Sequence, residues 1–190
     1  FQFVEREAPQ ATPFHFQGPF LGNGMRNGWA DQNSIVLWTR TTRQAEMVRD
    51  GARFLSVSAA DQRRLSQSGD EAACLNSQLP DGASLDDMFG ACPGAPGEVR
   101  LSYFPEKQPK QIISTDWKAT SADQDFTAQW RLEDLLPGRL YAAVLEARPL
   151  GSDQITAVVR GRFHTAPAAN KSQPVRFCLT TCHDFIRRDD

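Results

Sequence analysis

Six short segments of alternating apolar and polar residues constrain the fold of this chain more than any other feature. β-Branched and aromatic residues dominate them, and polar or turn-forming residues separate them. Side chains on a strand point alternately to its two faces, so such segments suit sheets that bury one face. A series of them predicts a mainly β protein built as an antiparallel β-sandwich. The predicted strands are 34–40, 53–58, 98–104, 126–132, 140–147 and 156–165.

Two aromatic residues sharpen this prediction. The run Leu135–Tyr141 places a Pro-Gly turn directly before a strand that carries Tyr141. A tyrosine there commonly hydrogen-bonds back to the turn, forming the tyrosine corner of sandwich domains. A tyrosine half-buried on its strand is the alternative. Trp38 lies in the middle of a predicted strand, where we expect its ring to fill the space between two sheets.

The sandwich is predicted to cover residues 18–167. Residues 1–17 show no clear period and contain two prolines, so we expect an extended arm there. An insertion over about 61–97 is rich in Gly, Pro, Ser and Asp. It is too long for a standard hairpin connection. The residues around 59–67 suit a short helix or turn.

A second unit is predicted to begin near the C-terminus. Residues 168–174 are small and polar and have the composition of a linker. The run Val175–Cys182 that follows alternates like a strand. A lone strand cannot bury itself. We therefore expect residues 175–190 to be the start of a further domain whose remainder is absent from this chain.

Composition limits the classes of partner. The 190 residues carry a formal net charge of −2, which creates no field that would attract nucleic acid. No apolar run approaches the roughly 18 residues that a transmembrane helix needs. No signal peptide is visible, and a chain that opens on Phe1 is expected to be processed or trimmed.

The first two cysteines, Cys74 and Cys92, bracket a polar stretch with little core to hold it. A disulfide between them would close about 17 intervening residues and stabilise the fold by roughly 3 kcal/mol. Two free cysteines in surface loops are the alternative. The disulfide would imply an oxidising compartment.

The last cysteine, Cys182, ends the predicted C-terminal strand and is followed by His183 and Asp184. Thiolate, imidazole and carboxylate groups all bind metals, so these residues form a candidate metal corner. Cys178 lies four residues earlier, about 13 Å away along an extended strand, which is too far for a disulfide. On spacing alone, a buried structural cysteine is favoured over a metal ligand as the explanation of Cys182.

An ordered series of short motifs resembles the PhoD-like alkaline phosphatase family. The strand that ends in Leu-Trp-Thr-Arg resembles the opening sandwich signature of that family. The Gly-Arg-Phe-His-Thr run, the linker and the Val-Arg-Phe-Cys run resemble its passage into the catalytic domain. The motifs are 18–22, 33–40, 136–141, 161–165 and 175–182.

The resemblance implies an immunoglobulin- or fibronectin-like sandwich, followed here by the first strand of a truncated α/β metallophosphoesterase domain. It implies an exported, extracytoplasmic phosphomonoesterase or phosphodiesterase that uses Fe3+ and Ca2+ and acts on phosphate esters. It places an iron ligand on Cys182, with the other ligands and the catalytic groups in the chain's own C-terminal catalytic domain. We therefore expect the 190 residues alone to be inactive.

Thr181 and His183 depart from the family pattern, so the class of phosphate ester stays open. His183, Asp184 and Arg26 are further candidates to lie near the metal or the substrate. Arg26 and Trp29 belong to a Gly/Asn-rich run expected to form a tight loop. A secreted sandwich for binding or adhesion, without catalytic activity, is the main alternative. A relative of the purple acid phosphatases is a third, which a cysteine ligand disfavours.

Overall fold

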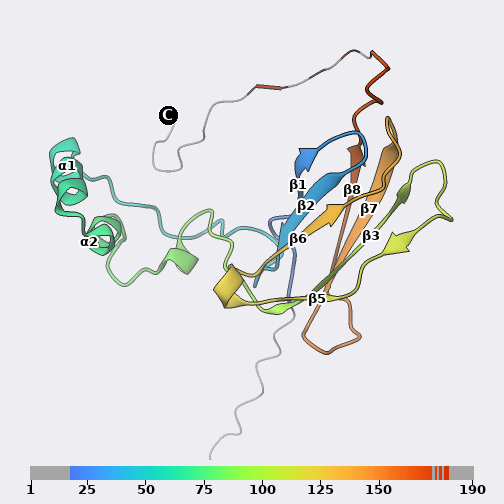
Figure 1. Cartoon of the computed structure of the whole chain (residues 1–190). Coiled ribbons are helices and arrows are strands. Elements are labelled where there is room, and N and C mark those ends of the chain that lie inside the picture. Colours follow the sequence, from blue (N-terminus) through green and yellow to red (C-terminus); the bar gives the residue numbers. More distant parts are fainter. Residues whose placement is uncertain (1–17, 173, 175, 177, 180–190) are drawn as a thin grey trace, which may run out of the picture.

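The structure is a computed structural model that describes residues 18–172, 174, 176 and 178–179. Over this range the chain forms two antiparallel β-sheets packed face to face, which confirms the predicted mainly β sandwich (Figure 1). The strands are β1 (Met25–Ala30), β2 (Ile35–Arg40), β3 (Gly97–Pro105), β4 (Ile113–Ser114), β5 (Lys118–Thr120), β6 (Thr127–Leu132), β7 (Leu140–Arg148) and β8 (Ala157–His164).

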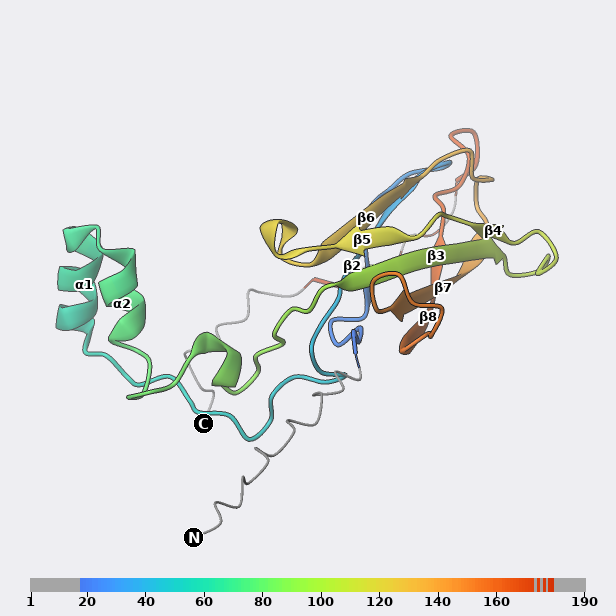
Figure 2. The ribbon, with the colours of Figure 1, turned by 90° about the horizontal axis from the view of Figure 1, so that it is seen from below.

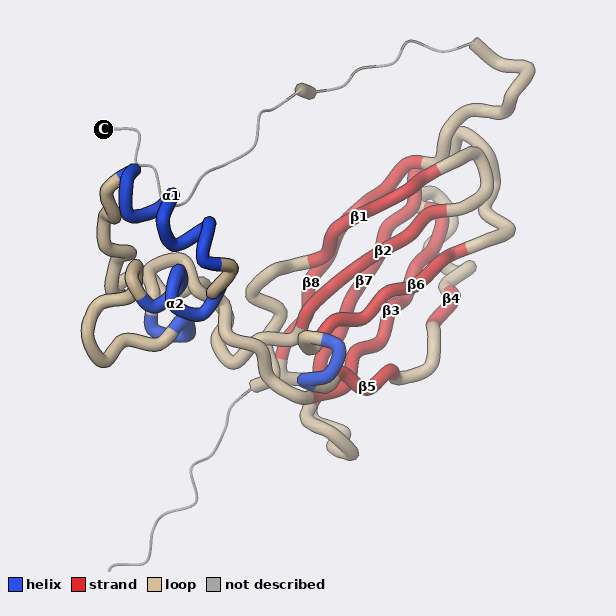
Figure 3. Tube along the Cα trace, turned by 60° about the vertical axis from the view of Figure 1, so that its left-hand side comes forward, coloured by secondary structure: helices blue, strands red, loops and turns tan. Residues whose placement is uncertain are grey.

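The order of the strands follows the immunoglobulin pattern. One sheet has the order β1-β2-β6, and the other has the order β4-β3-β7-β8, with β5 also paired to β3. In immunoglobulin nomenclature, the first sheet contains strands A, B and E, which are β1, β2 and β6. The second sheet contains strands C, F and G, which are β3, β7 and β8. Figure 3 shows the strands of the two sheets running in similar directions, as in aligned sandwiches.

The core lies between the sheets and arises from the two-residue period of the strands. In β2 every second residue is buried, starting at Ile35, and the same alternation runs through β7. Leu37, Leu101 and Leu145 are at most 2% exposed. Full burial of such a side chain stabilises the fold by roughly 1.5–3 kcal/mol.

The prediction for Trp38 was wrong. The buried residues of β2 are Ile35, Leu37 and Thr39, so Trp38 lies half-buried on the outer face of its sheet. A strand places neighbouring residues on opposite faces, and β2 turns its small threonine inward instead. The tryptophan on the inner face is Trp130 of β6, which lies opposite Leu37 and packs against the core.

The predicted strand at 53–58 is also wrong. Only the neighbouring Ala52 makes a bridge, to Met88, and Leu55 is 48% exposed. An alternating segment becomes a strand only where a partner lies beside it, and no sheet of the described range reaches these residues. The short helix expected next is confirmed as α1 (Ala59–Ser68), with the Ser58 side chain accepting from the Asp61 N–H at its N-terminus.

The insertion is longer than the sequence predicts. Thr42 bridges both Phe20 and Gly94, so the chain leaves the sandwich just after Thr42 and returns at Gly94. Between these points it forms α1, α2 (Glu71–Asn76) and the 3-10 turn η1 (Leu85–Asp87). Figures 1 and 2 show α1 and α2 standing away from the sheets. Neither helix buries a residue.

The glycine-rich run near the N-terminus is partly a strand. A turn is closed by the Gly24 N–H, which donates to the Leu21 carbonyl at 2.8 Å, and β1 begins one residue later. Gly24 has a φ of 67°, a left-handed conformation that favours glycine. β1 was not predicted because its sequence, Met-Arg-Asn-Gly-Trp-Ala, lacks an apolar alternation.

The tyrosine corner is confirmed. The hydroxyl oxygen of Tyr141 accepts a hydrogen bond from the Leu136 backbone N–H at 2.9 Å. The turn between them contains Gly138, with a φ of 61°. Tyr141 is 4% exposed, and its ring stacks on Phe163 with centroids 5.1 Å apart. One side chain thus fills the core and satisfies the backbone of the turn.

We predict that Tyr141→Phe destabilises the sandwich by about 1–3 kcal/mol, because it leaves the part-buried N–H of Leu136 without its partner. Urea unfolding followed by fluorescence measures this. Tyr103→Phe is the matched control, since Tyr103 packs 6.5 Å from Tyr141 but its hydroxyl makes no hydrogen bond within the described range. Equal losses for both variants would contradict a specific role of the corner.

Candidate functional site

The candidate metal corner lies outside the described residues, because Cys182, His183 and Asp184 are all in the part of the chain left undescribed. Cys178 is described and is an exposed free cysteine. The role of Cys182 as a metal ligand stays a prediction.

Arg26, the remaining candidate for substrate contact, lies exposed on β1. It faces Trp38 of β2 in the strand register, which places it on the outer face of the three-stranded sheet. No ion pair of Arg26 occurs within the described range. Trp29, on the same strand, is 71% exposed. The two residues therefore lie on a strand surface rather than in the expected loop.

The disulfide expected between Cys74 and Cys92 is not formed in the structure. Both cysteines are free and half-buried. Cys74 lies in α2, where the Gln78 side-chain amide contacts its sulfur at 3.9 Å. Cys92 lies in the segment that returns to β3, and its carbonyl accepts a hydrogen bond from Arg40. Backbone and side-chain hydrogen bonds hold the ends of the insertion instead.

The described residues contain no group of three or more His, Cys, Asp or Glu side chains that could hold a metal ion. Among the same residues, no helix is both long enough and apolar enough to cross a membrane.

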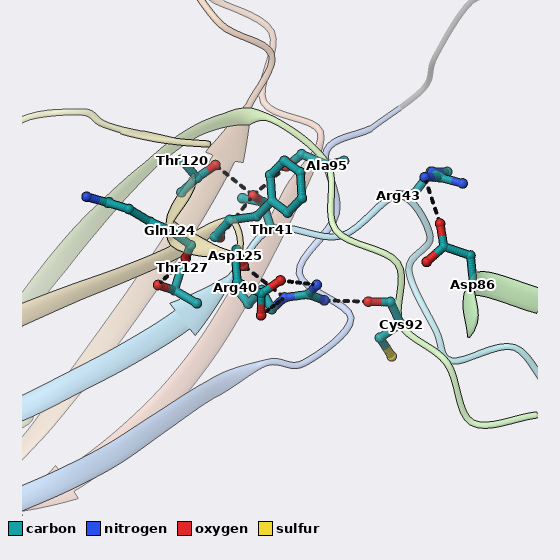
Figure 4. Close-up of polar contacts among 11 residues, drawn as sticks. Arg40, Thr41, Arg43, Asp86, Cys92, Ala95, Thr120, Gln124, Asp125 and Thr127 are labelled. Carbon is teal, nitrogen blue, oxygen red and sulfur yellow. Dashed lines mark hydrogen bonds and ion pairs between the residues drawn. The ribbon is translucent and has the colours of Figure 1, made fainter. Parts of the chain in front are cut away.

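The structure instead brings together a polar cluster where the insertion joins the sandwich. We call it the insertion clamp, and it consists of Arg40, Thr41, Thr42, Thr120 and Asp125. Figure 4 shows Arg40, Thr41, Thr120 and Asp125. Arg40 ends β2, and its side chain is 17% exposed. It donates to the Asp125 carboxylate at 2.7 Å, to the Asp125 carbonyl at 3.0 Å and to the Cys92 carbonyl. One guanidinium thus joins β2, the turn before β6 and the returning end of the insertion.

Thr41 is the buried centre of the insertion clamp, with an exposure of 0%. Its hydroxyl donates to the Ala95 carbonyl at 2.6 Å and shares a 2.7 Å hydrogen bond with the Thr120 hydroxyl. Its carbonyl accepts from the Ala95 N–H at 3.2 Å. Since buried polar groups are costly unless paired, these contacts fix where the insertion returns.

Thr42 ties the insertion to the N-terminal segment. Its N–H and carbonyl pair with the backbone of Phe20 at 2.9 and 2.8 Å. Its hydroxyl donates to the Gln44 carbonyl at 2.6 Å and accepts from the Gly22 N–H at 2.8 Å. The insertion clamp therefore holds both the departure of the insertion and the entry to β1.

Gly94, where the insertion returns to the sandwich, has no room for a side chain. A Cβ added to Gly94 would lie 2.0 Å from the ring of Phe126. Asp125 and Phe126 themselves have positive φ angles of 48° and 56°, an uncommon conformation for residues other than glycine. Such backbone persists only where the surroundings hold it, and here Arg40 and Thr41 supply the contacts.

The insertion clamp is structural rather than catalytic. The hydrogen bonds of Arg40 all go to Asp125 and Cys92, and the Thr41 hydroxyl is fully engaged. Farther out, the Arg43–Asp86 pair at 3.1 Å is about half exposed and stabilises little. Beside it, the Ser84 hydroxyl, helped by the Ser84 N–H and Arg43, lowers the pKa of Asp87.

A second set of polar contacts lies at the opposite end of the sandwich, where the chain leaves β8. We call it the exit cluster. It consists of the side chains of Asp31, Gln32 and Thr165 and the backbone groups of Leu136 and Ala166. Thr165 is 1% exposed, and its hydroxyl donates to the Leu136 carbonyl at 2.7 Å and accepts from the Arg139 N–H at 2.9 Å. The next N–H, of Ala166, donates to the Asp31 carbonyl at 2.9 Å. The leaving chain is thus tied to two turns.

The side chain of Asp31 organises the turn between β1 and β2. Its carboxylate accepts from the N–H groups of Asn33 at 2.9 Å and Ser34 at 2.6 Å, and from the Ser34 hydroxyl at 2.8 Å. The Asn33 N–H is the largest cause that lowers the pKa of Asp31, followed by the Ser34 hydroxyl; the Trp29 side chain also lowers it. In the chain, Trp29 lies in the last part of β1, two residues before Asp31.

No family model matches the chain, and no curated protein matches it. Among solved structures, PhoD is similar with 14% identity and a TM-score of 0.44 over 88% of this chain, which spans 22% of the PhoD chain. A computationally redesigned β-sandwich protein has 10% identity and a TM-score of 0.39, covering 75% of this chain and 90% of its own. The sensor domain of the anti-sigma factor RsgI4 of Pseudobacteroides cellulosolvens has 10% identity and a TM-score of 0.36, covering 76% and 93%. These TM-scores lie below 0.5, so the fold assignment rests on the strand pairings described above.

We predict that Arg40→Lys destabilises the protein by about 1–3 kcal/mol, because an ammonium cannot keep the fork of hydrogen bonds to Asp125 and Cys92. Urea unfolding measures the loss, and hydrogen exchange at the Ala95 amide should accelerate. Arg131→Lys is the matched control, since the Arg131–Glu133 pair at 2.9 Å is largely exposed. An Arg40 variant as stable as the control would refute the role of the insertion clamp.

The lowered pKa of Asp31 predicts a pH dependence. A carboxyl whose folded pKa lies below its ordinary value of 3.8 contributes stability above that pH and loses it as the pH falls further. Asp31→Ala should therefore lower the melting temperature at pH 7, and the difference from the parent should shrink below about pH 3.8. Thermal unfolding at pH 7 and pH 2.5 tests this. A difference that stays constant across that range would contradict it.

Proposed function

We propose that this chain is the N-terminal part of an exported, metal-dependent phosphatase or phosphodiesterase that resembles the PhoD-like family. The observation that carries the proposal is the ordered series of family-like motifs, ending in the run Val175–Cys182. Three of these motifs coincide with residues that hold the sandwich together: Arg40, Tyr141 and Thr165. This coincidence supports a common sandwich architecture, and Cys182 supports the chemistry.

The sandwich would act as the frame from which the catalytic domain starts. Thr165 fixes the end of β8, and a short linker leads from there to the run that contains Cys182. Cys182 would bind iron as a thiolate, with Ca2+ and the remaining ligands held by further residues of the same chain. Bound metal would supply a water of lowered pKa and offset charge on the phosphoryl oxygens.

The other candidates have smaller parts in this proposal. His183 and Asp184 follow the proposed ligand directly and would lie near the metal or the substrate. Arg26 lies on an outer sheet surface, which favours a contact with a neighbouring domain over a contact with phosphate. Export would place the enzyme outside the cytoplasm, where phosphate esters are its substrates.

The complete reading frame provides the test. We expect its product to hydrolyse an aryl phosphate monoester or diester in the presence of Fe3+ and Ca2+, and the 190-residue chain alone to be inactive. Metal analysis should find iron in the full protein, and Cys182→Ser should remove most of it with the activity. Cys178→Ser is the matched control and should keep both. A reading frame that ends at Asp190, or full protein without iron, would refute the proposal.

A non-catalytic binding or adhesion module is the second candidate, and the insertion favours it. Its helices bury no residue, and Leu75 and Leu85 are 36% and 49% exposed. A protruding element with uncovered apolar side chains suits a protein partner. If the full protein lacks hydrolase activity but loses a binding partner when residues 53–87 are deleted, this second function replaces the first.

A further inference from the structure

The exit cluster fixes the direction in which the chain leaves the sandwich. Besides the bonds of Thr165 and Ala166, the Gly138 N–H donates to the Ala166 carbonyl at 2.8 Å. Farther along, the Ala169 N–H donates to the Gln32 side chain at 3.3 Å. Residues up to Ala169 therefore lie against the turns that precede β2 and β7. Figure 1 shows the chain leaving at this end, away from the insertion.

Two large apolar side chains stand exposed beside this exit. Trp29 is 71% exposed near the end of β1, two residues before Asp31, and Leu136 is 49% exposed on the turn that holds Thr165. Asp31 and Leu136 are linked through Thr165 and Ala166, so both side chains belong to the same end of the sandwich. A tryptophan buries up to about 150–250 Å² and is among the residues that most often anchor an interface.

We propose that this exit surface, formed by Trp29, Gln32 and Leu136, docks the domain that follows the linker in the same chain. This inference rests on the proposed function, which places a catalytic domain from residue 175. Only residues 170–174 separate that start from the anchored Ala169, and the six Cα–Cα steps from Ala169 to residue 175 span at most about 21 Å.

This short tether decides which occupant meets the surface. A domain that begins within about 21 Å of Ala169 cannot reach the far end of the sandwich with its first residues. The start of that domain is therefore held near the exit surface at a high effective concentration, which favours its contact with Trp29 over contact with a separate partner. The exposed apolar side chains match what such an interface needs.

Hydroxyl-radical footprinting of the full protein tests the docking through the tryptophans themselves. In the sandwich alone Trp29 is 71% exposed, whereas Trp117 is half-buried, with the guanidiniums of Arg100 and Arg148 within 4.6 Å of its ring. Docking should make Trp29 react more slowly than Trp117. A Trp29 that reacts several-fold faster than Trp117 would overturn the proposal.

A pair of variants of the full protein gives a second readout. Trp29→Ser should release the docked domain and increase trypsin cleavage at Lys171, in the linker, by about tenfold. Leu150→Ser is the control, because Leu150 is 56% exposed in the loop between β7 and β8, at the other end of the sandwich. Equal cleavage of the two variants would overturn the proposal.

The outcomes separate docking from activity. If Trp29 is protected in a full protein that has no hydrolase activity, the docking proposal stands and the proposed function is refuted. If the full protein is active and Trp29 reacts faster than Trp117, the proposed function stands and the docking proposal is refuted. Protection that disappears on dilution would identify a second copy as the occupant and would also overturn the proposal.

Discussion

The sandwich depends on closing the long connection between β2 and β3. The chain leaves the sandwich after Thr42 and returns at Gly94, and only then can β3 enter beside β7. Closing a loop of this length costs roughly 3–4 kcal/mol of chain entropy. The hydrogen bonds of Thr41 and Arg40 offset that cost at the point where the two ends meet, each by about 0.5–1.5 kcal/mol or more where charged. A buried threonine and one arginine thus hold together the two ends of the insertion at the edge of the sandwich.

Side-chain hydrogen bonds hold the connecting segments at both ends of the sandwich. At one end, Arg40 and Thr41 hold an insertion that leaves and returns. At the other, Tyr141 and Thr165 hold a turn and a chain that leaves. In each case side-chain oxygens or nitrogens satisfy backbone groups that lie beyond the reach of the strand ladders. The core of the sandwich lies between these two ends and sets where both extensions begin.

The sequence predicted those features that depend on local pattern. Five of the six expected strands were found, and the Pro-Gly turn before Tyr141 predicted the corner. Trp38 was placed on the wrong face because hydrophobicity alone does not say which phase of an alternation is buried. β1 was missed because an edge strand needs no apolar pattern. The insertion clamp was out of reach because it joins Arg40 to residues 52 and 85 positions away.

The family-like motifs carry unequal weight for function. Arg40, Tyr141 and Thr165 have partners within the sandwich, so a non-catalytic sandwich of the same design would need them equally. They therefore argue for architecture, and fold does not imply activity. Cys182 lies outside the described residues, and the case for metal chemistry rests on the resemblance that makes it a ligand. The sandwich fixes the point where the chain leaves it and keeps the exposed Trp29 at the same end, an arrangement that is suited to position a second domain.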